Sequence, residues 1–160
     1  MEFKTLKIIF KHLFKFIAVA SFSIPAFANI ITTDGYVRAM PPSVPNTAAY
    51  LTIQNHGDKP VKLIAVKTDA AAKAEIHTIV EENGMVKMRQ IPHIEIASHG
   101  AKKLKPSAEH IMLLSLTSPL KEHDKVKLQL IFEDLEAVDV ELPVMKKAVE
   151  SADAHHHHHH

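Results

Sequence analysis

The sequence predicts an all-β fold. Its apolar segments are short, rich in β-branched residues and separated by turn formers, a pattern typical of a β-sandwich or barrel. In the segment 125–132, apolar residues alternate with mostly polar ones at the period of two that a half-buried strand requires. The alternating apolar set is Val126, Leu128, Leu130 and Phe132, set against Lys125, Lys127, Gln129 and Ile131. We expect about eight to nine strands in one domain.

The first four predicted strands end at recognisable turn formers. Pro41-Pro42 ends the first, and His56-Gly57 follows the second. After the third strand, the segment 69–73 has helical character for a single turn at most. These four strands are 35–40, 48–55, 61–68 and 74–82.

The last four predicted strands are 85–91, 110–116, 125–132 and 137–142. Pro92-His93 follows the first of these, and Glu122-His123-Asp124 separates the second from the third.

Asn83-Gly84 is the strongest hairpin signal in the chain, because both central residues of a type I′ turn need positive φ. A two-residue loop places Glu82 opposite Met85, and therefore Ile79 opposite Met88. His77 and Met88 then become diagonal neighbours on one face of the hairpin, about 7 Å apart at Cβ. A register slip of one residue would put them on opposite faces.

The first 28 residues have the features of a cleaved export signal. Four lysines precede the apolar stretch 16–24, and Ala26-Phe27-Ala28 has the small-x-small pattern of a cleavage site. The alternative is a membrane anchor, but this largely apolar stretch of nine residues is too short to span a bilayer. We expect a soluble periplasmic protein, without a lipid anchor because the chain has no cysteine.

The rest of the chain divides into a single domain over 29–145, a mobile charged tail over 146–154, and a purification tag over 155–160. Without the signal and the tag, the chain keeps six histidines and has 15 basic and 17 acidic residues, a formal net charge of −2. This near-neutral balance argues against nucleic acid as a partner. We expect a monomer.

Four residues are candidate ligands of a soft metal: His77, Met88, His110 and Met112. His110 and Met112 are two apart in a predicted strand and share a face, with Ile111 and Leu113 pointing into the core and the ligand face more exposed. Thioether sulfur is soft and uncharged, so two methionines and two imidazoles favour Cu(I). The alternative is that each methionine packs in the core and each histidine lies in a turn.

The spacing of these four residues resembles the signature of the periplasmic copper chaperones called PCuAC: His77, ten residues, Met88, twenty-one residues, then His110-Ile111-Met112. The resemblance extends to Val37-Arg38-Ala39, Pro41-Pro42, the run 46–51, Glu75-Ile76-His77 and the run 119–122. It implies a cupredoxin-like β-sandwich with a near-surface copper at one end. It also implies delivery of Cu(I) to the CuA centre of cytochrome c oxidase subunit II, with a Sco-type thioredoxin-like protein as a second partner.

Other functions remain open. A periplasmic copper store or buffer would use the same ligands, and a metal-free exported β-sandwich binding module would need none. No enzyme is expected, because no nucleophile motif is present and a blue-copper site needs the missing cysteine. Met85 and Met40 are candidates for an auxiliary role, whereas His56, His93, His99 and His123 are expected in solvated turns.

Overall fold

The computed structural model describes residues 30–146, which form ten β-strands and no helix. The strands are β1 (Ile30–Arg38), β2 (Thr47–Asn55), β3 (Val61–Lys67), β4 (Ala71–Glu82), β5 (Met85–Gln90), β6 (Ile94–Ile96), β7 (Ala101–Lys103), β8 (His110–Leu116), β9 (Lys125–Phe132) and β10 (Val138–Met145). The predicted all-β, cupredoxin-like fold is confirmed. Residues 30–146 contain no helix long and apolar enough to cross a bilayer.

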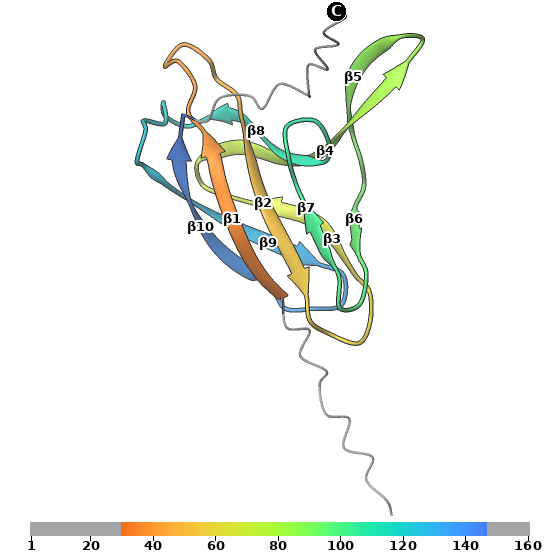
Figure 1. Ribbon diagram of the computed structural model, residues 1–160. Coiled ribbons are helices and arrows are strands. Elements are labelled where there is room, and N and C mark those ends of the chain that lie inside the picture. Colours follow the sequence, from red (N-terminus) through yellow and green to blue (C-terminus); the bar gives the residue numbers. More distant parts are fainter. Residues whose placement is uncertain (1–29, 147–160) are drawn as a thin grey trace, which may run out of the picture.

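Nine of the strands follow one another in the order β5-β4-β8-β2-β1-β10-β9-β3-β6, and β7 pairs with β2 beyond the segment that pairs with β8. All pairings are antiparallel except β1 with β10, where Val37 lies opposite Val144. The sheet curls over so that its two halves cover one core, and the β4–β5 hairpin extends beyond the other strands (Figure 1). Within the sheet, β5 pairs only with β4.

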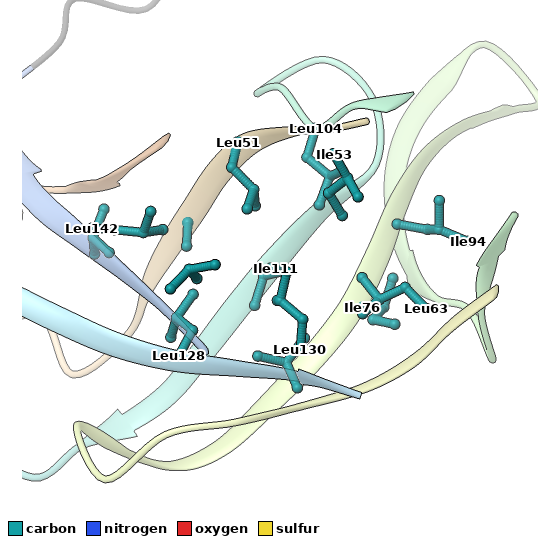
Figure 2. Close-up of a cluster of buried hydrophobic side chains, with 14 of the residues drawn as sticks. Leu51, Ile53, Leu63, Ile76, Ile94, Leu104, Ile111, Leu128, Leu130 and Leu142 are labelled. Carbon is teal, nitrogen blue, oxygen red and sulfur yellow. The ribbon is translucent and has the colours of Figure 1, made fainter. Parts of the chain in front are cut away.

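The core is built from one face of each long strand. In β9 the predicted alternation is confirmed, with Val126, Leu128, Leu130 and Phe132 buried. Ile111 of β8 and Ile76 of β4 point to the same interior, where they gather with Leu63 and Leu130 (Figure 2). Because side chains alternate along a strand, the neighbours of Ile76 and Ile111 must point to the other face of the sheet. That other face carries the candidate ligands.

Two expectations about the elements are wrong. No helical turn covers 69–73, because β4 begins at Ala71, which pairs with Leu116, and continues through Lys73, which pairs with Leu114. The sheet also has two strands of three residues each, β6 and β7, which the sequence did not predict. The expected signal (1–28), tail (146–154) and tag (155–160) lie outside the described residues, apart from Lys146.

A buried asparagine joins the loops at one end of the sheet. Asn55 is 1% exposed, and its side-chain amide donates to the carbonyl oxygens of Lys59 (2.8 Å) and Ala97 (3.0 Å). Its side-chain oxygen accepts a hydrogen bond from the backbone N–H of Gly57 (2.9 Å). One side chain therefore satisfies backbone groups of two separate loops.

Asn55→Ala should lower the free energy of unfolding by about 2 to 4 kcal/mol, because it leaves buried backbone groups without partners. Chemical denaturation followed by circular dichroism measures the change. His56→Ala, at the exposed neighbouring position, is the control and should change stability by less than about 0.5 kcal/mol. Equal effects of the two substitutions would contradict this account of the loops.

Candidate metal centre

Two histidines face each other across the pair β4–β8. His77 lies directly opposite His110 in the antiparallel register, next to the core pair Ile76 and Ile111. The two imidazole rings are 6.0 Å apart between centroids, with 44° between their planes. Directly opposite side chains on one sheet face are the closest that two strands can offer. The pair is therefore the centre of the candidate site.

The predicted register of the β4–β5 hairpin is confirmed. His77 pairs with Gln90 and Ile79 with Met88, on either side of a turn in which Asn83 (φ 54°) and Gly84 (φ 74°) both have positive φ. Met88 is therefore a diagonal neighbour of His77 on the same face.

The two methionines flank the histidine pair on opposite sides. Met112 lies opposite Glu75, two residues before His77, whereas Met88 lies opposite Ile79, two residues after it. In a flat sheet their Cα atoms would be about 16 Å apart, from strand spacings of about 4.8 Å and a rise of about 3.3 Å per residue. His77 is the one candidate that neighbours each of the other three.

The candidate residues differ strongly in exposure. Met88 is 48% exposed on the projecting hairpin, whereas His110 is only 2% exposed. The expectation that the whole ligand face would be the more exposed one is therefore wrong for His110. The reason is Tyr50 of β2, which is itself buried and packs its ring 6.2 Å from the His110 ring between centroids.

Burial controls the chemistry of His110. The cost of desolvating the charged imidazole lowers the pKa of His110, and the nearby His77 acts in the same direction, while the hydrogen bond to the carbonyl of Ala108 opposes the shift. His110 therefore stays neutral to a lower pH than an ordinary histidine. The neutral form is the one that binds metals.

His77 has one satisfied and one unsatisfied ring nitrogen. Nε2 lies 2.9 Å from a carboxylate oxygen of Glu75, whereas Nδ1 is buried without a hydrogen-bond partner. Buried polar atoms normally have a hydrogen-bond partner. An imidazole nitrogen without one is free to bind a metal ion through its lone pair. Across residues 30–146, no three His, Cys, Asp or Glu side chains come close enough together to hold a metal. The other candidate ligands on this face of the sheet are Met88 and Met112.

The remaining candidates lie away from the histidine pair. Met85 pairs with Glu82 on the other face of the hairpin and is 56% exposed. Met40 lines a small pocket with residues that include Leu116 and Leu120. The expectation of solvated turns is confirmed for the four other histidines of the domain, which are exposed and lie between strands: His56, His93, His99 and His123.

Sequence reasoning missed two residues of this site. Glu75 could have been found, because residues two apart in a strand share a face. Tyr50 had no such signal, since it reaches His110 through the pairing of β2 with β8, which no local pattern reports.

A family model described as "Putative lipoprotein LpqE-like" matches residues 30–144. The "Putative lipoprotein Lxx21020" of Leifsonia xyli is 29% identical over 99 residues, which cover 61% of this chain and 60% of that protein's length. The chain thus spans less than two thirds of this relative.

Two solved structures share the fold. The solution structure of CuI-DR1885 from Deinococcus radiodurans is 33% identical, with a TM-score of 0.60, covering 72% of this chain and 77% of that one. A copper-bound PCuAC domain from PmoF2 is 18% identical, with a TM-score of 0.63, covering 74% of this chain and 93% of that one. The resemblance to PCuAC domains is thereby confirmed, and the chain belongs to the LpqE-like family.

Proposed function

We propose that the chain is an exported copper chaperone that binds one Cu(I) through His77, Met88, His110 and Met112 and transfers it to a partner protein. The observation that carries the proposal is the facing pair His77–His110, with ring centroids 6.0 Å apart and a methionine on each side along the same sheet face.

The donor chemistry selects the metal. Imidazole suits several transition metals, but neutral thioethers favour soft, monovalent copper. The orphaned Nδ1 of His77 and the neutral state favoured at buried His110 supply lone pairs without a charged ligand. Copper-bound structures among the relatives, CuI-DR1885 and the PmoF2 domain, support the same cargo.

The difference in exposure supports a carrier rather than a sealed store. Met88 on the hairpin is nearly half exposed, so a partner's ligand can reach the copper from that side while buried His110 still holds it. Stepwise ligand replacement then moves the ion without releasing it to water. This role requires no catalytic chemistry. In the expected periplasmic location, the protein would meet copper acceptors that lie outside the cytoplasm.

Protein from which residues 1–28 and 155–160 are removed should bind one equivalent of Cu(I) tightly under anaerobic conditions, in competition with a calibrated chelator. The truncation is sound because all ten strands lie within 30–145. Met88→Ala and His110→Ala should each weaken binding by more than about 100-fold, since loss of an outer-shell partner alone costs 10- to 100-fold.

Met85→Ala is the matched control, because Met85 lies on the same hairpin but on its other face. It should bind copper like the parent, and a thermal melt should show that His110→Ala is still folded. A parent protein that does not bind Cu(I) would refute the proposed function.

The proposed acceptor is the CuA centre of cytochrome c oxidase subunit II, and a Sco-type thioredoxin-like protein is the proposed second partner in the transfer. Incubating the Cu(I)-loaded protein with a purified soluble domain of subunit II should move copper to that domain, as measured by metal analysis after separation. Retention of the copper by the loaded protein would instead identify a store or buffer.

A further inference from the structure

A carboxylate lies against the central histidine of the site. Glu75 is two residues before His77 on β4 and points to the same face, where its Oε2 is 2.9 Å from His77 Nε2. Both side chains are largely shielded, at 21% exposed for Glu75 and 14% for His77. The contact between Glu75 and His77 is therefore formed within one strand, and water screens it only partly.

This hydrogen bond sets the tautomer of His77. An ionised carboxylate only accepts hydrogen bonds, so Nε2 of His77 must carry the proton. In the neutral imidazole the lone pair is then on Nδ1, which is the buried nitrogen without a partner. A metal ion that bound Nε2 instead would have to displace both the proton and Glu75.

His110 has the opposite arrangement. Its Nδ1 lies 2.9 Å from the carbonyl oxygen of Ala108, which also only accepts, so Nδ1 carries the proton and Nε2 carries the lone pair. The two facing histidines are thus held in different tautomers, one by a carboxylate side chain and one by the backbone.

We propose that Glu75 is a positioning residue, which by holding the proton on Nε2 of His77 makes Nδ1 the nitrogen that binds copper. This inference rests on the proposed function for the identity of the metal, but the tautomer it assigns belongs to the metal-free protein. A carboxylate on the far side of a metal-binding imidazole fixes the ring orientation and raises the basicity of the ligand. His110 binds through Nε2, so the two imidazoles present different nitrogens to one ion.

Long-range ¹H–¹⁵N correlation spectra test the assignment on protein lacking residues 1–28 and 155–160. Without copper, His77 should show the tautomer protonated at Nε2, and His110 the one protonated at Nδ1. One equivalent of Cu(I) should shift the ¹⁵N resonances of His77 Nδ1 and His110 Nε2. A metal-free His77 protonated at Nδ1, or a copper-induced shift that is larger at His77 Nε2 than at His77 Nδ1, would overturn the proposal.

Two substitutions separate the hydrogen bond from the charge. Glu75→Ala should leave His77 as a mixture of tautomers and weaken Cu(I) binding by about 10- to 100-fold. Glu75→Gln should restore the Nε2–H tautomer, because its side-chain oxygen can accept the same hydrogen bond, and recover part of the affinity. Unchanged tautomer and affinity in Glu75→Ala would refute the positioning role.

Glu81→Ala is the matched control, since Glu81 lies on the same strand and face and is exposed. It should change neither the tautomer nor the affinity. If the parent binds no Cu(I), the proposed function fails together with the copper-binding role of Nδ1. Binding through Nε2 would refute this inference alone and leave the copper function standing.

Discussion

The antiparallel register of β4 with β8 is the constraint on which the candidate site depends. It brings His77 directly opposite His110 while the adjacent Ile76–Ile111 pair is buried in the core. Because side chains alternate, a shift of β4 by one residue would turn His77 into the apolar interior and move Ile76 out of the core at the same time. Packing of the core therefore fixes the geometry of the face that carries the four candidate ligands.

The two histidines differ in burial and in the groups that surround them. His110 is buried against Tyr50, and its side chain is hydrogen-bonded to the backbone carbonyl of Ala108. His77 lies between the buried part of the sheet and the hairpin that carries Met88. Copper at this pair would have one buried anchor and one side open to solvent. This asymmetry is what a carrier requires, because the anchor holds the ion and the open side admits the ligand of an acceptor.

The sequence predicted the local parts of this arrangement and missed the long-range ones. The register of the hairpin followed from Asn83-Gly84, and the buried face of β9 from simple alternation. The strands β6 and β7 were missed because three residues are too few to show a period. The alanine-rich segment at 69–73 suggested a helical turn, but Ala71 and Lys73 pair with β8, so tertiary contacts override local preference. The facing of His77 and His110 and the burial of His110 depend on pairings between strands distant in sequence.

The central claim is that the histidine pair and methionine sulfur together bind copper. X-ray absorption of the Cu(I)-loaded protein, without residues 155–160, measures this most directly because sulfur and nitrogen neighbours scatter differently. The account predicts a first shell with two nitrogen and two sulfur ligands, from His77, His110, Met88 and Met112. A shell of nitrogen and oxygen alone, with no sulfur, would contradict it.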